Sequence, residues 1–139
     1  MFYPYCATGE IKMIRFAMRV AFWLANRNEQ ARKLMQGWNR NVQFQIDKVE
    51  PFYVLIREGS AVVSPGLCEN PNLVMKASEA SFRRMLRGEI QFEEAFIRKQ
   101  IEAIGSVHDA ARFKRIIGIV LERHAPLISV FRSVFGRFI

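Results

Sequence analysis

The most constraining feature of this sequence is a segment, residues 70–107, in which the apolar spacing changes from that of a strand to that of a helix and back. The turn signal Asn70-Pro71-Asn72 precedes a compact apolar run, Leu73-Val74-Met75, and the two together predict a strand. Ser78 can cap a short helix, because its hydroxyl can accept a hydrogen bond from an N–H group of the first turn. Gly88 can end that helix, since glycine adopts the left-handed conformation without steric cost.

Large apolar residues of this segment form one face of each of two short helices. They are Phe82, Met85 and Leu86 in the first helix, and Phe92, Ala95 and Phe96 in the second. The alternation over residues 100–107, with Ile101 on one side, predicts another strand. Two short helices between two strands are typical of a lid or wall over an apolar space. We find no candidate catalytic residue in the segment.

The residues before this segment predict a long helix followed by three antiparallel strands. Apolar residues recur with helical spacing over residues 10–37. Strict alternation over residues 42–47 predicts a strand whose phenylalanine and isoleucine face the core and whose glutamines face solvent. Residues 52–57 are more fully apolar, which predicts a central strand. The tight turn Glu58-Gly59-Ser60 pairs it with residues 61–64.

The residues after this segment predict two more helices. Ser106 and Asp109 fit a capping box, and a helix should extend from there to about Arg123. Its apolar face is predicted to comprise Val107, Ala110, Phe113, Ile116, Ile117, Val120 and Leu121. A last helix over residues 127–139 carries an unusually apolar face, which must bury itself against the domain, a partner or a lipid.

Taken together, the elements predict the α+β class, with a five-stranded, mostly antiparallel sheet covered on one face by helices. We expect a single domain over residues 1–139: a long N-terminal helix at about 10–37, sheet and helices at 42–123, and a C-terminal helix at 127–139. Half of the residues are hydrophobic and 12% are aromatic, which is enough for a sizeable core.

The formal net charge is +8, and 15 of the 21 basic residues are arginines. Such a balance favours an anionic partner, such as lipid head groups, nucleic acid or an acidic protein, although solubility alone explains it equally well.

Three charges, Lys12, Arg15 and Arg19, interrupt the apolar run near the N-terminus, so neither a signal peptide nor a membrane span is expected. The two cysteines, Cys6 and Cys68, do not have a metal-site spacing, and we expect a reduced, cytoplasmic protein.

A search for catalytic patterns gives little. His108 has no neighbouring residues at metal-ligand spacing, and adjacent Glu93 and Glu94 point to different helix faces, where Arg98 and Lys99 can compensate them. We therefore expect no enzyme activity, no metal and no cofactor. The arginines around residues 83–87 and 112–115 match no nucleic-acid-binding motif, so a solvated helix surface is the preferred interpretation and nucleic acid is not the expected partner.

Residues from about Val42 to Leu121 resemble the sterol carrier protein 2 domain. The features that carry the resemblance are the hairpin with Gly59, the strand Asn72-Leu-Val-Met-Lys76, the run Ser78, Phe82, Leu86 and Gly88, the Ala95-Phe96 step, the Ile101 strand and Gly105. The resemblance implies a stand-alone, prokaryotic-type member of that family, with an apolar cavity between sheet and helices that holds a sterol, a fatty acyl chain or an isoprenoid-type lipid. It implies no catalytic residues. Two positions depart from the family pattern: Asn72, where an acidic residue is common, and Arg98, where a glycine is common.

By their place in this pattern, the apolar residues predicted to line the cavity are Phe82, Met85, Leu86, Phe92, Phe96, Ile101, Phe113, Ile117, Val120, Phe131, Val134 and Phe135. Arg98 is the candidate for contact with a head group. The expected partner is a lipid or another hydrophobic ligand. Transient contact with a membrane surface and a homodimer through the C-terminal helix are also compatible with the pattern. The alternative is a protein–protein adaptor, or an accessory factor of lipid or quinone metabolism, that docks through the C-terminal helix.

Overall fold

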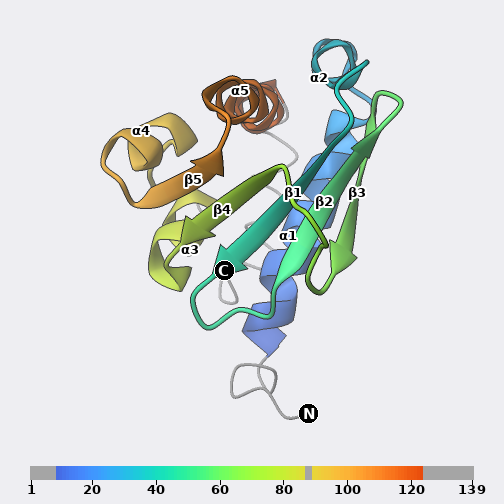
Figure 1. Ribbon diagram of the computed structural model, residues 1–139. Coiled ribbons are helices and arrows are strands. Elements are labelled where there is room, and N and C mark those ends of the chain that lie inside the picture. The colour runs from blue at the N-terminus through green and yellow to red at the C-terminus, as the bar shows by residue number, and fades with distance from the viewer. Residues whose placement is uncertain (1–8, 87–88, 124–139) are drawn as a thin grey trace.

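The computed structural model describes residues 9–86 and 89–123 of the chain. In chain order these residues form α1 (Gly9–Ala25), α2 (Glu29–Met35), β1 (Arg40–Ile46), β2 (Phe52–Arg57), β3 (Ser60–Pro65), β4 (Leu73–Ala77), α3 (Glu79–Leu86), α4 (Phe92–Ile97), β5 (Ile101–Gly105) and α5 (Val107–Arg123). Figure 1 shows α1 running behind the sheet, and α5 packs against α1 on that same side.

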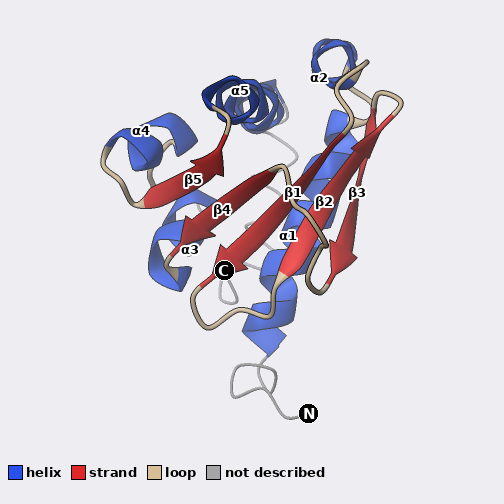
Figure 2. Cartoon of the chain, viewed as in Figure 1, coloured by secondary structure: helices blue, strands red, loops and turns tan. Residues whose placement is uncertain are grey.

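The five strands form one sheet in the order β3-β2-β1-β4-β5 (Figure 2). Three of the four neighbouring pairs are antiparallel, and β1 with β4 is the parallel pair. The α+β class and the mostly antiparallel sheet are therefore confirmed. The strand predicted to be central, β2, is an interior strand, although β1 occupies the middle of the sheet. Between β2 and β3 the two turn residues, Glu58 and Gly59, have φ angles of 52° and 77°, as a tight hairpin turn requires.

Where one helix is predicted over residues 10–37, the structure has two helices, and that prediction is corrected. The helical hydrogen bonding is interrupted by two asparagines. The Asn28 side chain caps α2 by accepting from the backbone N–H of Ala31 at 3.0 Å. The Asn26 side chain donates to the carbonyl of Ala61 at 2.8 Å and accepts from the N–H of Ala61 at 2.7 Å. Asparagine side chains compete well with helical hydrogen bonds, and here they attach the break to strand β3.

The core lies between the sheet and the helices and draws on almost every described element. The apolar residues that recur with helical spacing in α1 are buried where their side chains are described: Ile14, Met18, Phe22 and Ala25 each expose 3% or less, and Ala21 exposes 9%. On α5 the predicted face begins one turn later than expected. Val107 is 81% exposed, because the first helical residue precedes the turn that reaches the core.

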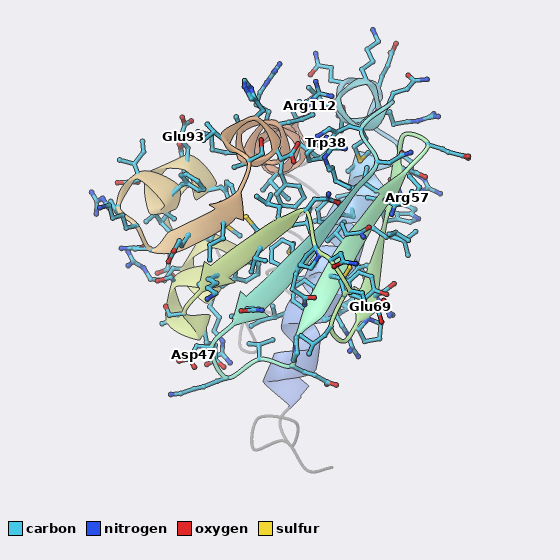
Figure 3. All side chains as sticks on the ribbon, viewed as in Figure 1. Trp38, Asp47, Arg57, Glu69, Glu93 and Arg112 are labelled. Atoms are coloured by element: carbon cyan, nitrogen blue, oxygen red, sulfur yellow. The ribbon has the colours of Figure 1, made fainter. Side chains whose placement is uncertain are left out.

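Gln43 was predicted to face solvent, but it exposes only 2% of its surface. The loop after β3 crosses the outer face of the sheet at this position; Figure 3 labels Glu69 on that loop. The amide of Gln43 donates to the carbonyls of Phe52 at 2.9 Å and Gly66 at 3.2 Å, and its oxygen accepts from the N–H of Cys68 at 2.7 Å. The outer face is thus closed here by a buried amide with satisfied hydrogen bonds.

Candidate functional site

Five phenylalanines from the sheet and the helices meet in the layer between them. The Phe44 ring of β1 stacks on Phe52 at 4.9 Å and contacts Phe82 of α3 edge-on at 6.2 Å. Phe113 of α5 lies 5.9 Å from Phe44 and also 5.9 Å from Phe22 of α1. Each of these residues exposes 2% or less. The layer is therefore a continuous aromatic interior, with ring separations in the range that favours aromatic pairs.

Two short helices form one wall of this interior. Helix α3 begins as predicted, because the Ser78 hydroxyl accepts from the N–H of Ser81 at 3.1 Å. It directs Phe82 and Met85 inward, while α4 directs Phe92 inward. Helices of eight and six residues are too short to be stable alone, so the burial of these side chains holds them in place. Gly88, predicted to end α3, lies outside the described residues.

Helix α5 packs beside α4, and a buried carboxylate fixes its first turn. The Asp109 carboxylate accepts a hydrogen bond from the indole N–H of Trp38 at 2.9 Å. The Nε of Arg40 donates to both carboxylate oxygens of Asp109, each at 3.1 Å. Trp38 is only 5% exposed, and Asp109 is 9% exposed. The guanidinium of Arg112 lies 5.8 Å from the Trp38 ring, on the same helix as Asp109. From the sequence, Asp109 is predicted only to belong to a capping box. Its hydrogen-bond partners Trp38 and Arg40 lie about 70 residues earlier in the chain, so no local sequence pattern indicates them.

The structure brings the described lining candidates together in one core. Those exposing 4% or less are Phe82, Met85, Phe92, Ile101, Phe113 and Ile117. Phe96 is partly buried, with the Lys114 ammonium 5.5 Å from its ring. Because the six are so little exposed, protein atoms fill the space beside them. The side chains of Leu86 and Val120, and residues Phe131, Val134 and Phe135, lie outside the described part of the chain.

Arg98 lies at the C-terminal end of α4, where its guanidinium pairs with Glu94 at 2.8 Å. Its φ angle of −79° is an ordinary value, so no glycine is needed at this position. The left-handed residue is its neighbour Lys99, with a φ of 61°. Arg98 therefore fits here without backbone strain, and the left-handed conformation falls on Lys99.

The basic residues of this wall are largely compensated by nearby carboxylates. Arg83 pairs with Glu79 at 3.4 Å, Arg84 with Glu89 at 3.9 Å and Lys114 with Glu93 at 3.7 Å. The pair of Arg84 and Glu89 lies at the solvated surface that the sequence predicts, whereas the side chains of Arg83 and Glu79 are only 17% and 24% exposed, so that prediction is corrected for Arg83. Within residues 9–86 and 89–123 no group of three or more His, Cys, Asp or Glu could hold a metal ion. No helix in these ranges is long and apolar enough to cross a membrane.

A broad hollow of about 790 Å³ lies at one end of the sheet, where β1 and β4 end and β5 begins. It is lined by three lysines, two serines, two glutamines and two carboxylates, together with five apolar residues, and none of the predicted cavity residues borders it. No local sequence pattern indicates this hollow, because its polar residues come from strands, turns and a helix that only the tertiary structure brings together.

Comparisons with known proteins agree with this architecture. The model of the SCP-2 sterol transfer family matches residues 23–118. Sterol carrier protein 2 from Yarrowia lipolytica in its apo form is 16% identical, with a TM-score of 0.57, over 79% of this chain and 92% of that one. A UbiJ-SCP2 ubiquinone synthesis protein is 10% identical, with a TM-score of 0.57, over 78% of this chain and 92% of that one.

The sec-alkylsulfatase Pisa1 from Pseudomonas sp. is 9% identical with a TM-score of 0.49, and the match covers 63% of this chain but only 14% of the sulfatase. The 16% and 10% identities to the Yarrowia protein and the UbiJ-SCP2 protein show a shared fold alone. No curated protein matches the chain by sequence.

Proposed function

Because this chain belongs to the SCP-2 sterol transfer family, we propose that it binds and carries a lipid in the apolar layer between its sheet and its helices. The observation that carries the proposal is the aromatic interior walled by two helices too short to be stable on their own. Apolar and aromatic walls with movable elements suit a ligand that is itself apolar and variable in shape. The proposed role is one of binding and transfer in the cytoplasm, without catalysis.

A lipid can enter this layer only if part of the wall moves outward. Displacing α3 and α4 would expose Phe82, Met85 and Phe92, at about 1.5–3 kcal/mol for each side chain, or roughly 5–9 kcal/mol together. Each methylene of a bound chain returns about 0.8 kcal/mol. Roughly six to eleven methylenes therefore offset the opening, whereas about four, as in hexanoate, do not. The proposal accordingly includes a chain-length threshold between about six and eleven methylenes.

The first experiment asks whether the purified protein carries a lipid. Native mass spectrometry and organic extraction should recover a bound lipid, and a fluorescent long-chain fatty acid should bind and be displaced by unlabelled palmitate but not by hexanoate. A protein that contains no lipid and shows no displaceable fatty-acid binding would contradict the proposal.

A matched pair of variants on α4 tests where the ligand lies. Phe96 packs against the core, whereas its neighbour Ile97 is 72% exposed. Phe96→Ala should weaken fatty-acid binding about five- to tenfold, because it removes an apolar seal worth roughly 1–1.5 kcal/mol. Ile97→Ala should leave binding unchanged. Equal effects of the two substitutions would place the ligand elsewhere.

Arg98 remains a candidate for contact with an acidic head group, since its paired guanidinium is exposed at the end of α4. Arg98→Gly should weaken binding of a fatty acid but not of its methyl ester. Unchanged affinity for both would assign Arg98 to the ion pair with Glu94 alone.

The second candidate function is that of an adaptor or accessory factor, for example in quinone synthesis. What favours it is the shared fold with the UbiJ-SCP2 ubiquinone synthesis protein. The docking helix predicted for residues 127–139 lies outside the described residues. Deleting Leu127–Ile139 separates the two functions: loss of self-association or partner binding with lipid binding retained favours the adaptor, and loss of lipid binding favours the carrier.

A further inference from the structure

The hollow at the end of the sheet collects three lysines from three separate places in the fold. Lys48 lies in the turn after β1, Lys76 on the outer face of β4, and Lys99 in the loop before β5. The strand register places Lys76 between the ends of two neighbouring strands, because Lys76 is paired with Gln45 of β1 on one side and with Glu102 of β5 on the other.

These three lysines differ from the others in the described part of the chain. Lys33 pairs with Glu29 at 3.7 Å, and Lys114 pairs with Glu93 at 3.7 Å. Among the residues whose side chains the structure describes, 14–85 and 89–119, no carboxylate lies within 4.0 Å of the Lys48, Lys76 or Lys99 ammonium, although Asp47 and Glu102 also line the hollow. The five charged groups leave a net charge of +1, arranged as three cations that are not neutralised by direct contact.

The other polar groups of the hollow add hydrogen-bonding capacity. Ser78 and Ser81 border it at the first turn of α3, where backbone N–H groups favour negative charge. Gln100 also borders it, and its side-chain oxygen is buried without a hydrogen-bond partner among the described residues. Below them, Ile46 and Val49 are each only 4% exposed and provide an apolar base.

We propose that this hollow binds a phosphate ester that carries a neighbouring hydroxyl group. The lysine ammoniums and the hydroxyl of Ser81, which accepts from the Ser78 hydroxyl at 2.9 Å and keeps its own hydrogen, supply the donors that phosphate oxygens need. A turn of the Gln100 side chain would bring its oxygen, which is buried without a partner among the described residues, to a hydroxyl of the ligand, and such a turn is favoured because a buried acceptor without a partner is costly. Glycerol phosphate has both groups, either as a free small molecule or as the head group of an anionic lipid. The site does not depend on the apolar interior, so this proposal can be tested independently of the proposed lipid carriage.

The backbone allows a charge to be removed without loss of stability. Lys48 and Lys99 have φ angles of 65° and 61°, a conformation that asparagine tolerates better than lysine. Lys48→Asn and Lys99→Asn should therefore keep or slightly raise the melting temperature while they weaken phosphate binding. A merely structural role for these lysines would not give this combination. Lys33→Gln, which removes a lysine charge far from the hollow in sequence, serves as the control.

The experiment is a titration of the full chain with glycerol 3-phosphate and with inorganic phosphate, followed by calorimetry or by NMR of the lysine side chains. Glycerol 3-phosphate should bind more tightly, and Gln100→Leu should abolish that difference. Each asparagine variant should weaken binding about three- to fivefold, as expected for one exposed charge contact. Asp47→Asn should strengthen binding, because it removes a repelling carboxylate from the rim; Figure 3 labels Asp47 beside β1.

Cosedimentation with phosphatidylcholine vesicles, with and without phosphatidylglycerol, identifies the source of the phosphate. Retention on phosphatidylglycerol vesicles that is lost in Lys48→Asn and Lys99→Asn identifies a lipid head group, whereas binding of glycerol 3-phosphate alone identifies a free metabolite. The proposal is overturned if neither probe binds, if the two asparagine variants bind like wild type, or if Lys33→Gln weakens binding equally.

Discussion

Replacing Asp109 by alanine should destabilise the fold by about 3 kcal/mol, because it removes the acceptor that joins helix α5 to the start of β1. The hydrogen bond from Trp38, at 2.9 Å to a charged acceptor, accounts for about 1.5–3 kcal/mol once the indole N–H is left buried and unpaired. The ion pair with Arg40 adds less, about 0–1 kcal/mol, since 35% of the Arg40 side chain is exposed and it can turn to solvent.

Asparagine at this position should cost only about 1 kcal/mol, because its side-chain oxygen can still accept from Trp38 while the ion pair is lost. Urea unfolding followed by tryptophan fluorescence measures both changes. Trp38 is 5% exposed, so its emission should shift strongly on unfolding, whereas Trp23 is already 52% exposed. With a denaturant slope of about 2 kcal/mol/M, Asp109→Ala should lower the urea midpoint by about 1.5 M and Asp109→Asn by about 0.5 M.

Glu93→Gln is the matched control, because Glu93 is also an acidic residue in the first turn of a helix. It should change stability by less than about 0.5 kcal/mol, which separates the contacts of Asp109 from a general effect of the helix dipole. A double-mutant cycle of Trp38→Phe and Asp109→Ala, followed by circular dichroism because Trp38→Phe removes the buried fluorescent reporter, should give a coupling free energy of about 1.5 kcal/mol. A cost below about 1 kcal/mol for Asp109→Ala, or a coupling near zero, would refute the reasoning.

Three further substitutions test other parts of the fold. Gln43→Leu should destabilise by about 2–4 kcal/mol in urea, because it orphans the Cys68 N–H that the amide oxygen binds; a neutral effect would mean that the loop is not held by this amide. Gly105→Ala should cost about 3 kcal/mol, since its φ is +145° and an added Cβ would lie 2.6 Å from the carbonyl oxygen of Asn72; a melting temperature equal to that of wild type would contradict this close approach. Glu58→Asn should raise stability by about 0.5 kcal/mol, because asparagine tolerates the left-handed turn, and a lower melting temperature would argue against that turn.

Much of the fold follows from local sequence patterns. Alternation placed Phe44 and Ile46 on the inner face of β1, and both are buried. The Ser78 cap and the helical spacing of Phe82 and Met85 predicted α3, which forms from Glu79 to Leu86. The family resemblance, read from the spacing of these elements, is confirmed by the family match over residues 23–118.

The candidate site could be predicted only in part. The lining residues described by the structure do converge on one interior, because the period of each helix determines which side chains face the sheet. Whether the interior is open or filled depends on how side chains from different elements interdigitate, as Phe44 does with Phe82 and Phe113. Packing of this kind is a property of the assembled core and not of any single segment.

The sequence by itself determined the class of the fold, the inward faces of its elements and the family, because periodicity, capping and turn chemistry act within a few residues. The tertiary structure alone decided the break at Asn26, the burial of Gln43 and the partners of Asp109. Their hydrogen bonds join residues 35, 25 and 71 positions apart, respectively. The tertiary structure also brings Lys48, Lys76 and Lys99 together at one end of the sheet. A polar side chain has no periodicity that identifies its partner, so its role becomes visible only when the fold brings distant segments together.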